Sequence, residues 1–223
     1  EGVVAHLSID ARGAHPTTTG VGRCVAEATE RGFARILTAA PHDDDLHPFV
    51  QHGFEPVEEL IVLAHDLATL PTAPTYRVRS FRLRYRSEVL AVDERAFQQF
   101  WQLDSAGLDE AFGATPRARG RLVRDHHSVI AYSVVGLSGS EAFIQRLAVD
   151  PDHQGVGLGR ALTVDGLAWA KSHMAGVAFV NTQRSNSAAL ELYDKLGFQR
   201  RSRPLTVMGL WLDDRPDDAA AGR

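Results

Sequence analysis

The sequence predicts an α/β protein, and three observations support this. Segments in which apolar residues alternate, as in a strand, interchange with segments in which they recur at helical spacing. A glycine-rich turn, HQGVGLGRAL at 153–162, separates a strand expected at 141–149 from a helix expected at 157–173. The first 70 residues repeat part of this pattern. Together these observations indicate a sheet flanked by helices.

The composition is that of an ordinary globular protein. Hydrophobic residues make up 44% of the chain and charged residues 23%, and the single cysteine, Cys24, excludes an internal disulfide. The formal net charge of −4 gives no electrostatic reason to bind nucleic acid. No apolar run approaches the ~18 residues that span a bilayer, and no signal-like region opens the chain. We therefore expect a cytoplasmic protein that binds neither nucleic acid nor a membrane.

The stretch LPTAPT is the clearest candidate for a linker, because its prolines and small residues separate two patterned regions. From it we expect a degenerate partial domain at 1–70, a linker at 71–75, a complete domain at 76–213 and a flexible tail at 214–223.

Apolar periodicity places the elements that follow this linker. Asp150-Pro151 ends one expected strand, because proline cannot donate to a ladder. Gly197 ends the last expected helix as a C′ residue. The expected strands are 76–81, 119–124, 128–137, 141–149, 177–182 and 205–212, and the expected helices are 86–100, 105–114, 157–173 and 187–196.

Three stretches of the N-terminal part match the C-terminal part in the same order. PFVQHGFEPVEELIVL (48–63) matches LYDKLGFQRRSRPLTV (192–207), TGVGRCV matches VGLGRAL, and HLSID matches RLAVD. The N-terminal part therefore looks like a second copy of only the later half of the C-terminal part, without counterparts for 76–140.

The stretch RLAVDPDHQGVGLGRAL, followed by NSAALELYDKLGF, resembles the GNAT family of N-acetyltransferases. The family's pyrophosphate loop, Gln/Arg-x-x-Gly-x-Gly/Ala, is filled by Gln154, Gly157 and Gly159. Its later helix, Asn-x-x-Ala-x-x-x-Tyr ending in Gly-Phe, is filled by Asn186, Ala189, Tyr193, Gly197 and Phe198. The resemblance implies a mixed, mostly antiparallel central sheet flanked by helices, here preceded by a partial copy, a layout similar to tandem members of the family.

The resemblance also implies acetyl-CoA as cosubstrate. In the family a splayed strand offers backbone groups to the pantetheine arm, and the N–H groups of the following loop hold the pyrophosphate. Taken alone, the loop could equally be an ordinary helix-entry turn, while a P-loop and a dinucleotide fingerprint both fail on spacing. The implied coenzyme-binding residues are Leu147, Ala148, Val149, Gln154, Gly155, Val156, Gly157, Leu158, Gly159, Arg160, Asn186 and Tyr193.

Tyr193 is the expected general acid. Acetyl transfer to an amine expels a thiolate, which benefits from a nearby proton donor, and a phenol with a pKa of ~10 is protonated at pH 7. In the family the tyrosine at this place lies beside the sulfur. The alternative is a half-buried tyrosine that packs the helix. Asn186 is either a helix N-cap or a coenzyme contact, and the two roles are compatible.

The general base stays open. Glu141 resembles the glutamate that some members use on this strand, but it could also be a solvent-facing strand residue. Asn181 stands where other members carry a glutamate and cannot serve as a base. Ordered water, His126 and His127 are the other candidates.

Trp101 and Asp104 are the expected acceptor-binding residues, because the family places acceptor-binding helices where this chain has FQQFWQLDSAGLDEAF. They could offer an apolar wall and an anionic partner to an ammonium group. Phe97 and Phe100 are expected to pack inward. No metal is expected, since the stretch PHDDDLHP at 41–48 matches no ligand spacing.

The implied function is transfer of acetyl from acetyl-CoA to a primary amine, of a small molecule or a protein N-terminus, by direct attack in a ternary complex. One alternative is a non-catalytic acyl-CoA-binding or sensing module, which could dispense with Tyr193. Another is an RNA-binding adaptor that uses the alternating arginines of 77–86, which the net acidity opposes. The partial copy has Thr17 and Phe49 where the motif has Gln154 and Tyr193, so it is expected to be structural.

Overall fold

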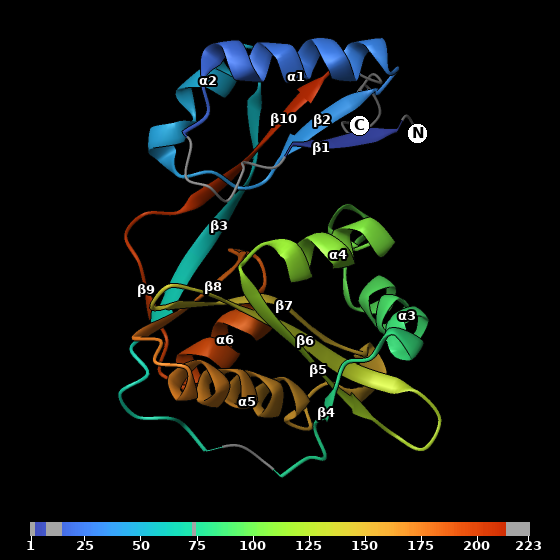
Figure 1. Ribbon diagram of the computed structural model, residues 1–223, viewed down its shortest axis with the longest axis vertical. Helices are drawn as coiled ribbons and strands as arrows, with labels where there is room; N and C mark the ends of the chain where they lie inside the picture. The colour runs from blue at the N-terminus through green and yellow to red at the C-terminus, as the bar shows by residue number, and fades with distance from the viewer. Residues whose placement is uncertain (1–2, 8–14, 73–74, 213–223) are drawn as a thin grey trace, which may run out of the picture. The chain divides into compact units, whose positions relative to one another are not determined.

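The computed structural model describes residues 3–7, 15–72 and 75–212 (Figure 1). Its contacts divide the chain into two compact units. The first contains residues 1–62, 182–185 and 201–223, and the second contains 63–181 and 186–200. This division differs from the expected boundaries because the last strand belongs to the first unit.

The first unit is a small sheet with two helices. β1 and β2 are parallel, α1 connects them, and β10 pairs antiparallel with both β2 and β3. Ile36, Phe49, Phe54 and Met208 form its buried core. Its elements are β1 (Val4–Leu7), α1 (Thr18–Glu30), β2 (Arg35–Thr38), α2 (His47–Val50), β3 (Glu55–His65), which continues into the second unit, and β10 (Leu205–Trp211).

The glycines of TTTGVG lie inside α1 and not in a loop before it. The helix begins at Thr18, and the Thr17 side chain caps it by accepting a hydrogen bond from the Gly20 N–H. A Cβ on Gly22 would stand 2.8 Å from the His52 ring, so this glycine permits close packing. The stretch is therefore a capped helix start in this unit.

The second unit carries the complete set of elements that the motifs occupy. β4 to β7 are antiparallel neighbours, and β7 is parallel to β8, with α5 as the crossover. The elements are β4 (Arg79–Ser80), α3 (Arg86–Ala96), α4 (Ser105–Gly113), β5 (Arg117–Arg124), β6 (Val129–Ser138), β7 (Glu141–Val149), α5 (Leu158–Ser172), β8 (Val177–Gln183), α6 (Ser187–Lys195) and β9 (Gln199–Arg200).

Helices cover both faces of this sheet (Figure 1). Leu122 and Tyr132 belong to the cluster under α3 and α4, whereas their chain neighbours Val123 and Ala131 belong to the cluster under α5. This follows from the alternation of side chains along a strand. The predicted fold class, a mixed and mostly antiparallel sheet flanked by helices, is confirmed, while the N-terminal partial copy stays a prediction.

Two expected elements are shorter in the structure. The strand expected at 76–81 is a regular strand only at Arg79–Ser80, which pairs with β5. The helix expected at 86–100 ends at Ala96, because Phe97 is extended and the chain turns back. The Asp93 carboxylate stabilises this turn by accepting a hydrogen bond from the Leu103 N–H over 2.7 Å. None of the described helices is long and apolar enough to cross a membrane.

We expect a 75–223 fragment to be less stable and less soluble than the whole chain. β10 pairs with β2 on one side and β3 on the other. The fragment lacks both strands, so both edges of β10 would be unpaired. Thermal unfolding and sedimentation of the two chains test this. A fragment with the full melting temperature and solubility would contradict it, and residues 1–70 alone should transfer no acetyl group.

Candidate active site

The site is built on a fork between β7 and β8. The two strands pair only where Glu141–Phe143 lies beside Val177–Phe179, although β7 continues to Val149. Beyond Phe143, among the described residues, β7 keeps a strand partner only on its β6 side. Apart from the Val149 carbonyl, which accepts a hydrogen bond from Gln154, backbone groups on the open side can therefore bind another extended chain. This stretch includes the predicted Leu147, Ala148 and Val149.

The loop after β7 exposes the N-terminus of α5. Gly155 and Gly157 have φ angles of 78° and 95°, a region that favours glycine. Gly157 takes the N-cap position of α5 and offers no side-chain cap. Within the described part of the chain, the N–H groups of 155–160 find no hydrogen-bond acceptor. Unpaired N–H groups and the positive end of the helix dipole together form a site for an anion such as phosphate.

Two neighbouring side chains shape this loop. Gln154 Nε2 donates to the Val149 carbonyl over 3.2 Å and so closes the end of β7. A Cβ on Gly159 would stand 3.3 Å from a methyl group of Leu192, so α6 packs closely on the first turn of α5. The glycines at 155 and 157 are needed for backbone conformation, and Gly159 for the contact with α6.

Asn186 and Tyr193 both lie at α6. Asn186 is the N-cap, since its Oδ1 accepts a hydrogen bond from the Ala189 N–H over 3.1 Å, and its coenzyme contact stays a prediction. Tyr193 is 4% exposed and its ring lies 5.3 Å from that of Phe198. Burial raises the pKa of the Tyr193 phenol above its ordinary value of 10. The buried phenol stays protonated at neutral pH, its position also fits the packing alternative, and the general-acid role of Tyr193 stays a prediction.

The candidate bases lie at opposite ends of β7: Glu141 at its start, and the β5–β6 turn with His126 and His127 beside its end, where the Asp150 N–H donates to the Ile130 carbonyl. Glu141 is exposed and lies beside the β6–β7 turn, at the paired end of the fork. At ~3.3 Å per strand residue, roughly 20 Å separates it from Leu147. His126 and His127 lie in the β5–β6 turn, where backbone N–H groups donate to Asp125 and lower the pKa of its carboxyl group.

The predicted acceptor residues follow α3. Asp104 caps α4, since its Oδ1 accepts a hydrogen bond from the Gly107 N–H over 2.7 Å. The half-buried Trp101 packs edge-on against Phe100, with ring centroids 4.9 Å apart. The Trp101 carbonyl accepts a hydrogen bond from Arg146 over 2.6 Å. Asp104 thus stabilises the start of α4. The acceptor-binding role of Trp101 and Asp104 stays a prediction.

Sequence reasoning missed a buried ionic network next to these residues. Asp93 is fully buried and receives two hydrogen bonds from Arg146, of 2.6 and 2.7 Å, as well as one from the Tyr132 hydroxyl. The Arg146 guanidinium also lies 3.6 Å from the centroid of the Phe97 ring. The network joins α3 and the Trp101 segment to β6 and β7. An aspartate among the apolar residues of a helix is the sequence signal that could have revealed it.

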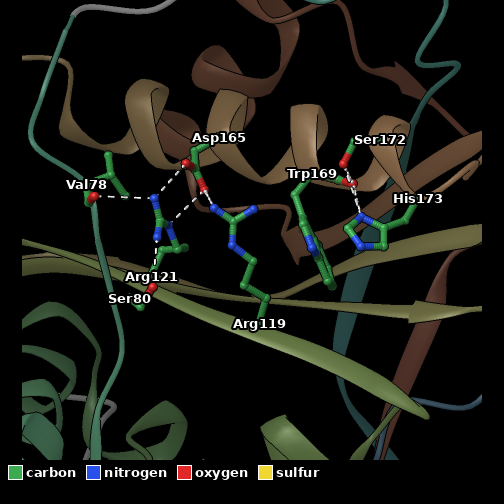
Figure 2. A network of polar contacts seen from close by, with 8 residues as sticks. All are labelled: Val78, Ser80, Arg119, Arg121, Asp165, Trp169, Ser172 and His173. Atoms are coloured by element: carbon green, nitrogen blue, oxygen red, sulfur yellow. Dashed lines mark hydrogen bonds and ion pairs between the residues drawn. The ribbon is translucent and has the colours of Figure 1, made fainter.

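A second network ties α5 to the other face of the sheet. Figure 2 shows Asp165 of α5 between two arginines of β5, with nitrogen–oxygen distances of 2.8 Å to Arg119 and 3.2 Å to Arg121. Arg121 also donates to the Val78 carbonyl and to Ser80 Oγ. These charge-assisted bonds hold α5, the helix whose N-terminus follows the glycine loop, against the sheet.

The acidic stretch at 41–48 forms ion pairs. Asp43–Asp45 is a single 3₁₀ turn, in which Asp44 pairs with Arg203 and Asp45 with His15. No group of three or more metal-binding side chains that could hold an ion is found in the described ranges.

Comparison with known proteins assigns this chain to a family. Residues 85–198 match the model of the acetyltransferase (GNAT) family. The chain is 31% identical over 170 residues to the mycothiol acetyltransferase of Catenulispora acidiphila, a match that covers 68% of this chain and 54% of that protein. The chain thus spans about half the length of this curated relative.

Solved structures share the fold. One is a tandem GNAT protein from the clavulanic acid biosynthesis pathway, with a TM-score of 0.64 and 14% identity, covering 95% of this chain and 76% of that chain. Another is the PaiA N-acetyltransferase of Thermoplasma acidophilum in complex with coenzyme A, with a TM-score of 0.52 and 12% identity, covering 62% and 99%. With the family model matched over half of its residues, the chain belongs to the acetyltransferase (GNAT) family.

Proposed function

We propose that this chain transfers the acetyl group of acetyl-CoA to a primary amine by direct attack in a ternary complex. The observation that carries the proposal is the uncapped start of α5, behind Gly155 and Gly157, at the open end of the β7–β8 fork. Such a site suits a pyrophosphate, and the free edge of β7 suits the amide groups of a pantetheine arm.

The binding roles divide between backbone and side chains. Leu147, Ala148 and Val149 would bind the arm through the strand edge, and the N–H groups of 155–160 would bind the pyrophosphate. Asn186 would contact the coenzyme from the start of α6. Because most of these contacts are made by the backbone, specificity for the coenzyme depends on the conformation of the loop more than on side-chain identity.

The chemistry needs two protons removed from the nitrogen and one supplied to the sulfur. The amine nitrogen, after losing its first proton, attacks the acetyl carbonyl carbon, the carbon–sulfur bond breaks, and the thiolate takes a proton from Tyr193. The second nitrogen proton leaves as the amide forms and restores the Tyr193 phenol. The attacking ammonium must first lose a proton, and Glu141, ordered water, His126 and His127 remain the candidates for its removal.

The acceptor is proposed to be a small molecule that carries a primary amine. The name of the curated relative, a mycothiol acetyltransferase, supports this choice over a protein N-terminus. Trp101 and Asp104 would line the acceptor side.

The experiment that tests the function is release of free coenzyme A from acetyl-CoA against pooled small amines and peptides, with the acetylated product identified by mass spectrometry. Acetylation of small amines supports the proposal. Acetylation of peptides alone would reassign the acceptor. Tight acetyl-CoA binding with no release for any acceptor would favour a non-catalytic acyl-CoA-binding module.

Tyr193→Phe should lower kcat by ~100-fold, because the leaving thiolate loses its proton donor. The affinity for acetyl-CoA should change little, since the ring and its contact with Phe198 are kept. Stopped-flow acetyl transfer and calorimetry measure the two quantities. An unchanged transfer rate would return Tyr193 to a packing role.

A further inference from the structure

The segment before β4 contacts the glycine loop at two points. Tyr76 Oη donates a hydrogen bond to the Val156 carbonyl over 2.6 Å, and Arg160 Nε donates to the Thr72 carbonyl over 2.7 Å. The Tyr76 ring also packs against the apolar cluster under α5 that contains Leu158. Residues 80 or more positions apart in the chain are thereby joined at the loop.

The bond from Tyr76 fixes the orientation of one peptide unit in the loop. In a planar trans peptide the carbonyl and the N–H of one unit point in opposite directions. With the Val156 carbonyl held by Tyr76, the Gly157 N–H points away from Tyr76 and, among the described residues, has no acceptor. This N–H belongs to the set proposed to bind the pyrophosphate.

This peptide unit needs such a restraint. It joins Val156 to Gly157 in a loop where Gly155 and Gly157 both have positive φ, and Val156 is 58% exposed, so side-chain packing restrains it little. Glycines lose more conformational freedom on ordering than any other residue. A loop ordered before binding does not lose that freedom when the ligand arrives, and its affinity is correspondingly higher.

We propose that Tyr76 is a positioning residue of the coenzyme site, which orders the loop through the Val156 carbonyl so that the Gly157 N–H is directed at the pyrophosphate. This rests on the proposed function, because it requires that the loop bind acetyl-CoA. Tyr76 itself touches neither the acetyl group nor the acceptor in this scheme. Its removal should weaken coenzyme binding and leave the chemical step unchanged.

The test is Tyr76→Phe, which removes the hydroxyl and keeps the packed ring. The net contribution of one hydrogen bond corresponds to about threefold to tenfold in an equilibrium constant, so we expect acetyl-CoA to bind that much more weakly in calorimetry. KM for acetyl-CoA should rise by a similar factor, while kcat at saturating acetyl-CoA stays at the wild-type value. A role in stability alone would lower the melting temperature without this split between KM and kcat.

Tyr85→Phe is the matched control. It removes a phenol hydroxyl of the same unit, where Tyr85 Oη accepts a hydrogen bond from Arg84 over 3.0 Å, and it does not touch the loop. We expect its acetyl-CoA affinity to equal that of the unaltered chain. Equal weakening of acetyl-CoA binding in both variants, or an unchanged affinity in Tyr76→Phe, would overturn the role of Tyr76 and leave the proposed function standing. If the unaltered chain binds no acetyl-CoA, the proposed function falls and the inference with it.

Discussion

Gly157→Glu should abolish measurable binding of acetyl-CoA while the chain stays folded. The substitution places a side chain where φ is 95°, a conformation that costs an L-residue ~1–2 kcal/mol. It also adds a negative charge at the uncapped start of α5, where a pyrophosphate is proposed to bind. Calorimetry should show a loss of at least ~100-fold, since backbone strain and charge repulsion act together.

Two further variants separate these effects. Gly157→Ala introduces the backbone strain without the charge and should bind acetyl-CoA with intermediate affinity. Gly176→Glu adds the same carboxylate at an exposed glycine with open space around it and should bind normally. Wild-type affinity in a folded Gly157→Glu chain would show that the loop is not the coenzyme site.

Arg146→Met should destabilise the protein by about 3–5 kcal/mol, the usual cost of removing one partner of a buried ion pair. The substitution leaves the Asp93 carboxylate, which is fully buried, with hydrogen bonds only from the Tyr132 hydroxyl and the Leu103 N–H. The flexible methionine fills much of the space of the arginine stem, so the loss reflects the unpaired charge more than a cavity. Urea unfolding followed by circular dichroism measures the change.

Glu191→Gln is the control for this experiment. It breaks the Lys195–Glu191 pair on α6, in which both side chains are more than 60% exposed, and should leave the urea midpoint unchanged. A variant Arg146→Met with the wild-type midpoint would show that the buried network contributes nothing to stability. An equal loss of unfolding free energy in both variants would indicate that the stability contributed by an ion pair in this protein does not depend on its burial.

Elements whose pattern is local could be predicted from the sequence. The helices and strands from 105 onward match their predicted ranges within a few residues, because each has its own periodicity and its own ending, such as Asp150-Pro151 or Gly197. The glycine loop could also be predicted, since positive φ restricts the choice of residue at 155 and 157. These features depend on neighbouring residues alone.

Features that depend on distant residues could not be predicted. The helix expected at 86–100 stops early because the Asp93 carboxylate binds the Leu103 N–H, and the same carboxylate pairs with Arg146, 53 positions along the chain. Tyr76 and Val156 are 80 positions apart. No periodicity records such pairs, so the glycine loop could be located from sequence, whereas the distant groups that contact it could not.

The place of β10 has a consequence for how the chain folds during synthesis. β2 and β3 are complete by His65, yet the strand that pairs with both begins only at Leu205. At ~5–20 residues per second, roughly 7–28 s pass between the two on the ribosome. During that interval β2 and β3 leave the exit tunnel with unpaired edges, which are open to pairing with other chains. The first unit therefore completes its sheet only after the strands and helices of the second unit have been made.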